Sequence, residues 1–433
     1  MIKKITQKKI AVVGLGYVGL PLGLLADRKG YEVYGIDCNK DKVNKINKRI
    51  LPYEDKDLSV QLKKSSIEAT TEWHNIAHTS IVIICVPTPV NHKPDLGPVK
   101  DACIEVAKHI QKGHVVVLES TVNPGVCDEI VLPLMEEISG MKCGVDFYLA
   151  HCPERINPGD VKWNVANIPR VIGSFDAKGL KKSVDFYESI IEAEIKPMKS
   201  LKEAEAVKIV ENSFRDINIA FVNELAQSFS HLGIDVVNVI NGASTKPFSF
   251  LAHYPGCGVG GHCIPVDPYY LIAYAKKNGF KHRFLALARK INNDMPKFSV
   301  KLVADLLKDR GEEIRGAKIA VLGLAYKANI GDCRESPSFE IIRELEKKGA
   351  VVSSFDPYVL EESTVKSMDE AVHNAHAVVV ATDHAIFKEL SPEYFIKHNV
   401  NVIIDGRNCL AEDKYVAAGI MYEGIGKKHI YQF

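Results

Sequence analysis

The sequence has no long apolar run, and its basic first residues, MIKKITQKKI, lead into no extended apolar stretch. A membrane-spanning helix needs about 18 or more consecutive apolar residues, and a secretory leader needs an apolar segment behind its charged start. We therefore expect neither a spanning helix nor a signal or transit peptide, and we expect a cytoplasmic protein.

An excess of charge of one sign is also missing, because 55 lysines and arginines stand against 54 aspartates and glutamates. A net charge of +1 gives no electrostatic reason to bind nucleic acid or an anionic membrane. The balance does not exclude a small phosphorylated ligand, since a few local donors are enough to hold one.

The ten cysteines form no CxxC pair and no cluster with histidine. We therefore expect no metal site, and in a chain of this length without a secretion signal such cysteines are mostly reduced core residues. A catalytic thiol among them would be recognised by its surroundings in the sequence.

The first 200 residues alternate between short apolar strands and helical stretches, which predicts a first domain over 1–200. After the first strand, a helix is predicted from about Leu20 to Lys29. Alternation of this kind predicts a parallel sheet covered by helices, the doubly wound α/β or Rossmann-like fold. The predicted strands are Lys9–Val13, Glu32–Ile36, Ile81–Val86, Val115–Glu119 and Tyr148–His151.

From Leu201 to Leu232 apolar residues recur at spacings of three and four, with no turn signal between them. This pattern predicts one helix that is too long for an α/β unit. We expect a helical central domain over 201–310, interrupted by a Gly- and Pro-rich loop at Pro255–Pro268. Its long helix would link the flanking domains and pair subunits in a homodimer or larger homo-oligomer.

The start of the chain is then repeated in degenerate form, because IAVLGLA at 319–325 resembles IAVVGLG at 10–16. We expect a second doubly wound domain over 311–433. Close approach of its backbone to a dinucleotide is doubtful, because the second and third glycines are missing. Its predicted strands begin at Ile319 and continue at Val351–Phe355, Val378–Thr382 and Val402–Asp405.

Gly14, Gly16 and Gly19 follow the first strand and open a helix. In this position the first glycine permits a tight turn, the second lets the backbone approach a pyrophosphate, and the third lets helix and strand pack closely. Asp37 ends the next strand, where a carboxylate binds the adenosine ribose and repels a 2′-phosphate. The pattern predicts dinucleotide binding and favours NAD over NADP.

Two further groups of residues suggest chemistry without establishing it. The segment GVGGHCIPVD places Cys263 behind several glycines and four residues before Asp267, which could expose the thiol to a substrate. Lys208, Asn212 and Arg215 share one face of the long helix and could stabilise an oxyanion. Taken alone, a core cysteine and a solvated helix face explain these patterns better than catalysis does.

Together these motifs resemble the UDP-sugar 6-dehydrogenases, a family that includes UDP-glucose, UDP-N-acetylmannosamine and UDP-N-acetylglucosamine dehydrogenases. The resemblance covers essentially the whole chain. It depends on VGLGYVGLP near the start, VPTP at 86–89, ESTVNPG at 119–125, CPERINPG at 152–159, KIVENSFRDINIAFVNE at 208–224, GVGGHCIPVD at 258–267, GLAYKANIGDCRES at 323–336 and DGRN at 405–408.

The resemblance assigns roles to individual residues. Cys263 matches the nucleophile, Lys208 the catalytic lysine, and Asn212 and Asp267 its partners, while Thr121 and Glu154 match residues that hold or activate water. The residues implied to contact NAD are Gly14, Gly16, Tyr17, Val18, Gly19, Asp37, Lys42, Pro87, Thr88, Thr121 and Arg334. The residues implied to contact the UDP-sugar are Glu154, Arg155, Ile156, Lys208, Asn212, Arg215, Tyr254, Gly260, Tyr326, Lys327 and Arg407.

The implied reaction oxidises C6 of the sugar twice. NAD takes a hydride from the alcohol, Cys263 captures the aldehyde as a thiohemiacetal, and a second oxidation gives a thioester that water hydrolyses. The uronate product would suit capsule, O-antigen or S-layer polysaccharide biosynthesis.

The sugar is indicated by local sequence. CPER at 152–155, IPVD at 264–267 and His262 resemble the N-acetylhexosamine branch, and TKPF at 245–248 with YPG at 254–256 favours UDP-N-acetylglucosamine. Cys257 departs from the proline that relatives often carry there. UDP-N-acetylmannosamine, UDP-N-acetylgalactosamine and UDP-glucose remain alternatives.

Two other functions compete with this interpretation. A single-step 3-hydroxyacid or 6-phosphogluconate type dehydrogenase would share the first domain but would need neither the repeat at Ile319 nor Cys263. A nucleotide-sugar sensor would not need Cys263, Lys208 and Asp267 together.

Overall fold

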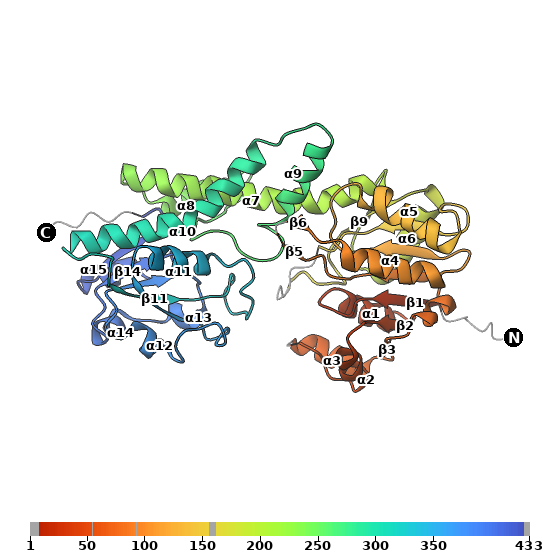
Figure 1. The fold of residues 1–433 in the computed structure, drawn as a ribbon, viewed down its shortest axis with the longest axis horizontal. Coiled ribbons are helices and arrows are strands. Elements are labelled where there is room, and N and C mark those ends of the chain that lie inside the picture. Colours follow the sequence, from red (N-terminus) through yellow and green to blue (C-terminus); the bar gives the residue numbers. More distant parts are fainter. Residues whose placement is uncertain (1–7, 54, 92, 156–161, 428–433) are drawn as a thin grey trace. The chain divides into compact units, whose positions relative to one another are not determined.

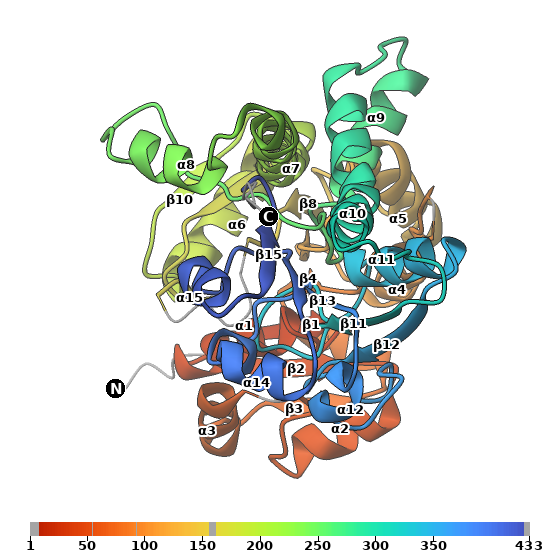
Figure 2. The same ribbon diagram turned by 90° about the vertical axis from the view of Figure 1, so that its left-hand side faces the viewer.

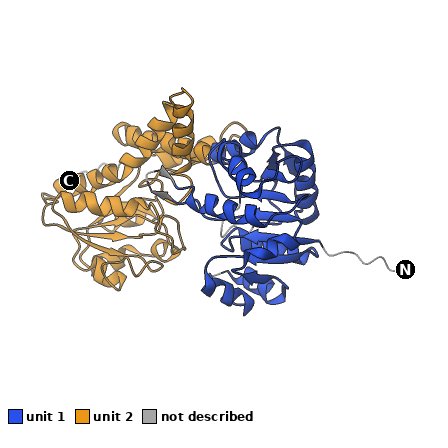
Figure 3. Ribbon diagram, turned by 45° about the vertical axis from the view of Figure 1, so that its right-hand side comes forward, with its two compact units in different colours: residues 1–211 blue, residues 212–433 orange. Residues whose placement is uncertain are grey.

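The computed structural model describes residues 8–53, 55–91, 93–155 and 162–427. The chain forms two compact units, residues 1–211 and residues 212–433, which are coloured separately in Figure 3. The boundary between them falls inside one continuous helix, α7 (Leu201–Leu232), whose ends match the predicted helix. Ile156, which the sequence assigns to substrate binding, lies outside the described residues.

Unit 1 is built around a sheet of eight strands in the order β10-β9-β8-β7-β4-β1-β2-β3. All the predicted strands are present, although two of them end earlier than predicted, at Ile84 and Leu118. The strands and helices of unit 1 that precede α7 are β1 (Lys9–Val13), α1 (Gly19–Arg28), β2 (Glu32–Ile36), α2 (Lys40–Asn47), α3 (Lys56–Lys64), β3 (Glu68–Thr70), η1 (Trp73–His78), β4 (Ile81–Ile84), β5 (Val90–Asn91), β6 (Lys93–Pro94), α4 (Gly97–His109), β7 (Val115–Leu118), η2 (Cys127–Val131), α5 (Leu132–Ser139), β8 (Tyr148–His151), β9 (Arg170–Ser174), α6 (Ala177–Ile190) and β10 (Ile195–Pro197).

The predicted strands pair with one another in parallel, as expected, but the sheet also contains one antiparallel pair, which includes the unpredicted strand β9. β8 and β9 pair antiparallel, with Ala150 opposite Ser174 and His151 opposite Gly173. A parallel return needs a crossover connection, usually a helix, and the described residues between β8 and β9 contain none. The sheet becomes parallel again after α6, where β10 pairs with β9.

The core of unit 1 lies on both faces of this sheet. Ile10 and Val12 of β1 belong to one buried cluster, with side chains of α1 and α6. Ala11 and Val13 belong to the other, with side chains of α4 and α5. Successive side chains of a strand point to opposite faces, so a continuous apolar strand is the pattern expected for a sheet covered on both sides.

Unit 2 contains the second doubly wound domain and the helices that precede it. Its sheet has five parallel strands in the order β12-β11-β13-β14-β15. The strands and helices that follow α7 are α8 (Val236–Ser244), α9 (Asp267–Lys277), α10 (Phe284–Asp309), β11 (Lys318–Leu322), α11 (Pro337–Lys347), β12 (Val351–Phe355), α12 (Met368–Val372), β13 (Ala377–Val380), α13 (Ala385–Lys388), α14 (Pro392–Lys397), β14 (Val402–Asp405), α15 (Glu412–Ala417) and β15 (Met421–Gly424).

Helices cover both faces of this sheet as well. α10 and α11 lie over one face, and α12, α13 and α14 lie over the other (Figure 1, Figure 2). Ile319 and Val321 of β11 point into the first cluster, and Ala320 and Leu322 point into the second. α10 shares a hydrophobic core with the sheet that follows it. Most of the predicted central domain, 201–310, therefore falls in the same compact unit as the second sheet. The predicted division of the chain into three domains stays a prediction.

Within the part of the chain that the structure describes, no helix is long and apolar enough to cross a membrane.

Candidate functional site

The carboxyl edge of the unit 1 sheet gathers most of the residues that the sequence assigns to NAD. Gly14 follows β1 with φ +91°, and a Cβ there would lie 2.6 Å from the carbonyl oxygen of Cys85. A Cβ on Gly19 would collide with the Gly14 carbonyl. These two glycines are therefore required by the turn and by the packing of α1 against β1.

Gly16 is different, because a Cβ there would meet no protein atom within 4 Å. Protein packing does not explain a glycine at this position, whereas close approach of a pyrophosphate does. The neighbouring Tyr17 is exposed and lies against Tyr53, with ring centroids 4.3 Å apart. The turn thus fits the dinucleotide that the sequence predicts.

Asp37 closes β2 and is held in place from two sides. One oxygen accepts hydrogen bonds from the Leu15 backbone N–H at 2.9 Å and from Lys42 Nζ at 2.7 Å. The Lys42 ammonium therefore neutralises the negative charge of the Asp37 carboxylate. Both residues lie where the sequence predicts the adenosine ribose to bind. Their contact supports the assignment of Lys42 as well as Asp37 to this edge.

The loops after β4 and β7 complete the edge. Pro87 and Thr88 follow β4, and Thr121 follows β7. Ser120 fastens the two loops together, because its hydroxyl donates to the Val86 carbonyl at 2.7 Å. Residues that are far apart in sequence thus meet at the end of adjacent parallel strands, as the doubly wound fold requires.

Glu154 and Lys208 also meet within unit 1. Glu154 follows β8, Lys208 lies on α7, and Lys208 Nζ is 3.7 Å from Glu154 Oε2. Burial raises the pKa of Glu154, and the Lys208 ammonium partly opposes that shift. A half-buried carboxyl with a raised pKa beside a cation is suited to exchange a proton with water or substrate.

Arg155 has a partner that the sequence did not suggest. Its guanidinium binds Glu211 through two nitrogens, with Nη2 at 2.5 Å from Oε1 and Nε at 3.2 Å from Oε2. It also donates to the Pro169 carbonyl at 2.9 Å. The predicted contact of Arg155 with a UDP-sugar would have to compete with this ion pair.

A second group that the sequence analysis missed lies beneath this edge. Glu119, at the end of the β7 segment, accepts a hydrogen bond from the Tyr187 hydroxyl at 2.5 Å and pairs with Arg170 at 3.4 Å. All three side chains are buried. The Glu119 carbonyl in turn accepts the Glu154 backbone N–H at 3.3 Å, so this buried pair supports the residue above it.

In unit 2, Cys263 occupies the turn that leads into α9. Its carbonyl accepts the backbone N–H groups of Val266 and Asp267 at 3.1 and 2.8 Å. The Asp267 side chain, at the first position of α9, accepts a hydrogen bond from Asn212 Nδ2 at 2.5 Å. The structure therefore brings together Asn212 and Asp267, which the sequence predicted as partners near the thiol.

Packing requires the glycines before Cys263, whatever their role toward a substrate. A Cβ on Gly260 would lie 2.6 Å from Tyr326 Cβ, and one on Gly261, at φ +91°, would lie 2.9 Å from the Tyr326 ring. The Gly261 N–H donates to the Arg334 carbonyl at 2.9 Å. Packing against the loop 326–336 therefore requires glycine at both positions, and access of a substrate to the thiol stays a prediction.

Other predicted substrate residues surround a cavity of about 330 Å³ in unit 2. Tyr254 and Arg407 line this cavity. Gly256 lets the Arg407 side chain lie close to the backbone, because a Cβ on Gly256 would lie 2.9 Å from Arg407 Nη1. The further lining residues, none of which the sequence analysis identified, are Val237, Asn241, Asp383, Lys388, Asn408 and Cys409.

The segment before Cys263 is tied to α7 and α10 by a buried set of polar side chains. Asn223 accepts the Gly256 N–H at 3.0 Å and donates to Asn292 Oδ1 at 2.8 Å. Asn292 donates to Asp216 Oδ1 at 2.8 Å, and Asp216 also pairs with Arg289 at 2.5 Å. The sequence offered no signal for this set beyond polar residues on the inner faces of two helices.

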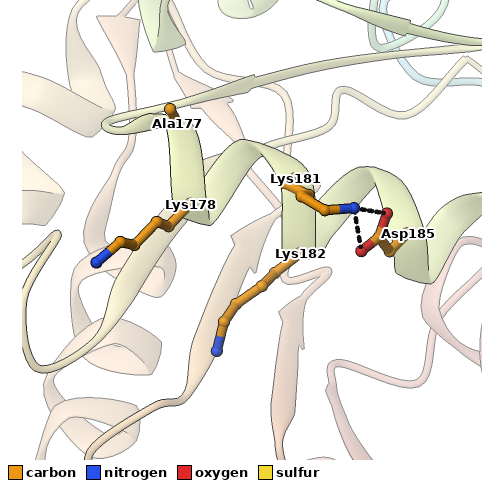
Figure 4. A pocket seen from close by; sticks show the side chains of 5 residues that line it. All are labelled: Ala177, Lys178, Lys181, Lys182 and Asp185. Carbon is orange, nitrogen blue, oxygen red and sulfur yellow. Dashed lines mark hydrogen bonds and ion pairs between the residues drawn. The ribbon is translucent and has the colours of Figure 1, made fainter.

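A larger hollow of about 390 Å³ lies on the outer side of α6 in unit 1, as Figure 4 shows. It is lined by Ala177, Lys178, Lys181, Lys182 and Asp185, and Lys181 is paired with Asp185 at 3.0 Å along the helix. None of the predicted site residues lines it.

Comparison with known proteins agrees with this geometry. Three models of the UDP-glucose/GDP-mannose dehydrogenase family match the chain: the NAD binding domain over residues 8–191, the central domain over 202–294 and the UDP binding domain over 320–412. This chain belongs to the UDP-glucose/GDP-mannose dehydrogenase family. It is an NAD-dependent UDP-sugar dehydrogenase by family, and its unit 1 contains the family's NAD binding domain.

Relatives of this dehydrogenase carry different sugar names. The UDP-N-acetyl-D-mannosamine dehydrogenase of Pyrococcus horikoshii is 36% identical over 97% of this chain and 99% of its own length. The UDP-N-acetyl-D-glucosamine 6-dehydrogenase of Pseudomonas aeruginosa is 35% identical over 94% of this chain and 98% of its own.

Solved structures in the family are similar over the same extent. The structure of the Pyrococcus horikoshii enzyme covers 97% of this chain and 99% of its own with a TM-score of 0.90. An NDP-N-acetyl-D-galactosaminuronic acid dehydrogenase from Methanosarcina mazei Go1 is 33% identical, covers 98% and 96% of the two chains, and has a TM-score of 0.89. The family and fold predicted from the motifs are therefore confirmed.

Proposed function

We propose that this dehydrogenase oxidises the C6 alcohol of a UDP-N-acetylhexosamine to the carboxylate, with UDP-N-acetylglucosamine as the preferred substrate. The observation that carries the proposal is the contact between Asn212 and Asp267 at the turn that holds Cys263. A buried amide and carboxylate beside a thiol form a set that can orient a reacting C6 group and its water.

The oxidation proceeds through covalent capture on Cys263. NAD, when bound, supplies the acceptor for one hydride in each of two oxidations. The alcohol first loses a hydride and a proton to become an aldehyde. The Cys263 thiolate then forms a C–S bond to that aldehyde, and the resulting oxygen takes up a proton to give a thiohemiacetal. Loss of a second hydride and proton leaves a thioester on Cys263.

Hydrolysis then releases the product. Water adds to the thioester carbonyl, the C–S bond breaks, and the sulfur leaves as the regenerated thiolate. Glu154 accepts a proton from this water, and Lys208 with Asn212 stabilises the oxygen on C6 in the tetrahedral states. The balance is one alcohol, one water and two NAD in, and one carboxylate, two NADH and three protons out.

The hexosamine substrate is supported by local sequence and by the relatives. CPER at 152–155 and IPVD at 264–267 resemble the N-acetylhexosamine branch, and the named relatives act on UDP-N-acetylmannosamine or UDP-N-acetylglucosamine. TKPF at 245–248 favours the glucosamine epimer. The UDP portion would bind in unit 2, where the UDP binding domain model matches and where Tyr254 and Arg407 line a cavity.

The test is NADH formation with a panel of UDP-N-acetylglucosamine, UDP-N-acetylmannosamine, UDP-N-acetylgalactosamine and UDP-glucose. We expect two NADH for each UDP-sugar consumed and the highest kcat/KM for UDP-N-acetylglucosamine. A ratio of one NADH to one product would contradict the thioester scheme. A higher kcat/KM for another sugar would contradict the epimer assignment alone.

We also propose that the enzyme forms at least a dimer through α7. Phe214 and Phe221 are seven residues apart on this helix, so they lie on one face, and both are exposed in the single chain. Exposed aromatic residues aligned on a long helix are suited to pack against a second copy. Sedimentation of the purified protein as a monomer at micromolar concentration would contradict this.

A further inference from the structure

Asp356 ends β12 of the second doubly wound domain, at the position that corresponds to Asp37 in the first. Both oxygens of its carboxylate accept hydrogen bonds from other groups of the protein. Oδ2 accepts the backbone N–H groups of Leu324 and Ala325 at 2.6 and 2.8 Å, and Oδ1 accepts that of Tyr358 at 2.8 Å. The remaining contact is a hydrogen bond at 2.9 Å between Oδ2 and His384 Nε2, and both side chains are fully buried.

The two ring nitrogens of His384 have complementary partners. Nδ1 lies 2.8 Å from the Asn329 backbone N–H and must accept from it, so Nε2 carries the proton and donates to Asp356. Burial alone would raise the pKa of Asp356, but the hydrogen bonds from His384 and the three backbone N–H groups outweigh it and lower that pKa. An ionised acceptor and a neutral imidazole therefore satisfy each other without an unpaired group.

Asn329 belongs to the loop 326–336. His384 therefore connects this loop to Asp356 at the end of the sheet, because it binds both residues. Asn329 has φ +60°, and its side chain accepts the Ala385 N–H at 2.9 Å, so it touches the segment around His384 at two points. Tyr358 contacts both residues, because its ring stacks on His384 with centroids 4.9 Å apart and its hydroxyl donates to Asn329 Oδ1 at 3.5 Å.

The other end of this loop contacts the segment that holds Cys263. The Tyr326 N–H donates to the Asp332 carbonyl at 3.0 Å, which closes the loop on itself. The Arg334 carbonyl accepts the Gly261 N–H at 2.9 Å, and the Tyr326 side chain packs against Gly260 and Gly261. A displacement of the loop would therefore move the turn before Cys263.

We propose that Asp356 and His384 form a buried clasp that positions the loop 326–336 for a nucleoside diphosphate. In a dinucleotide-binding domain the carboxylate at the end of this strand binds ribose. Here the clasp uses it to present Tyr326 and Lys327 to the UDP portion of the substrate. His384 is a positioning residue in this scheme, and the inference rests on the proposed binding of a UDP-sugar in unit 2.

Three substitutions of His384 separate its two contacts. His384→Asn keeps an oxygen near the Nδ1 position, which can accept from Asn329, but loses the donor to Asp356. His384→Gln keeps a donor near the Nε2 position and loses the acceptor. His384→Phe loses both and keeps the ring. Each variant is measured as the full-length protein for amide hydrogen exchange of a peptide spanning 326–336, and for binding of UDP by calorimetry.

A second pair of variants tests the same contact at an exposed position, because substitutions of the buried His384 could prevent folding. Asn329→Gly suits the positive φ and removes the side-chain acceptor of the Ala385 N–H, without disturbing the core. Asn374→Gly is the matched control, because Asn374 also has a positive φ, of 53°, and precedes β13 at the opposite edge of the same sheet.

We expect faster exchange confined to 326–336 and at least about tenfold weaker UDP binding in His384→Phe and His384→Gln, since a lost buried hydrogen bond typically costs that much. His384→Asn should stay closer to the wild type, Asn329→Gly should weaken UDP binding by about threefold, and Asn374→Gly should change neither quantity.

Unchanged loop exchange in His384→Phe would overturn the proposal, as would faster exchange spread evenly over unit 2. Faster loop exchange with unchanged UDP binding would also overturn it, because the loop would then be held for stability alone. Failure of the wild type to bind UDP would instead contradict the proposed function, and the wild-type measurement reveals that outcome before any variant is compared.

Discussion

Asn223 offers a direct test of whether buried polar contacts hold the substrate loop in place. The side chain lies inside unit 2, where it accepts the Gly256 N–H at 3.0 Å and donates to Asn292 Oδ1 at 2.8 Å. Alanine at this position would remove both bonds and leave no polar atom in their place. We expect Asn223→Ala to loosen the segment around Gly256 and, with it, the approach of Tyr254 and Arg407 to the cavity.

The magnitude follows from the groups left without partners. A buried donor or acceptor that loses its partner costs about 1–3 kcal/mol, so the two groups together give about 2–6 kcal/mol. Asn292 Nδ2 keeps its hydrogen bonds to the Asp216 carbonyl and carboxylate at 3.0 and 2.8 Å, so Asn292 stays in place and only its Oδ1 and the Gly256 N–H lose a partner. We therefore expect a cost near the lower end, about 2 kcal/mol. A loss of about 2 kcal/mol corresponds to about thirtyfold faster opening.

Amide hydrogen exchange of a peptide containing Gly256 is the suitable measurement. Both tryptophans, Trp73 and Trp163, lie in unit 1, so intrinsic tryptophan fluorescence would not report on unit 2. Asn218→Ala is the matched control on the same helix, because Asn218 is only partly buried and donates to the Phe214 carbonyl within its own helix. We expect that control to change the free energy by less than about 0.5 kcal/mol. Equal exchange in the two variants would refute the argument that Asn223 fastens this loop.

Three further predictions concern the chemistry. Cys263→Ser should lose turnover to the acid, and uronate formed by this variant would contradict covalent capture. Cys143→Ser is the control and should retain turnover, because Cys143 is a buried thiol in the segment before β8 of unit 1. Burial raises the pKa of Glu154 above its ordinary 4.5, so the hydrolytic rate should rise with pH as this carboxyl loses its proton, and in Glu154→Gln that rise should vanish and the rate fall about a hundredfold. Asp37→Asn removes the charge that repels a 2′-phosphate and leaves Lys42 without its carboxylate partner. The preference for NAD over NADP in kcat/KM should therefore fall about tenfold. Asp41→Asn on α2 is the control, and an NAD to NADP preference that is the same in both variants would refute the role of Asp37.

Much of the fold was predictable because its signals are local. Apolar runs define the buried strands, and unbroken spacings of three and four predict the extent of α7. The antiparallel pair of β8 and β9 was not predictable, since strand direction depends on how the intervening chain returns, and 152–169 offers no helix pattern. The sequence therefore indicates which segments are strands more reliably than how they pair.

The site was predictable where one residue type is required by the chemistry. Gly16, Asp37 and Cys263 belong to such motifs. The supporting residues were missed, because buried polar side chains such as Asn223 and Glu119 acquire their role from partners far away in sequence. The glycines before Cys263 show the converse problem, since the same residue type serves substrate access and close packing equally well.

The two carboxylates Asp37 and Asp356 occupy corresponding positions, so the sequence around them does not distinguish the two nucleotide domains, although the glycines missing from the second domain do. Each ends the second strand of its domain and accepts backbone N–H groups from the turn after the first strand. They differ in the side chain that donates to Oδ2, because Asp37 binds Lys42 on the following helix, whereas Asp356 binds His384, which lies after β13. Lys42 is only five residues from Asp37, but His384 is 28 residues from Asp356. At the position where Asp37 is predicted to bind ribose, Asp356 is thus bound by a distant histidine of its own domain, and that difference is visible only in the folded chain.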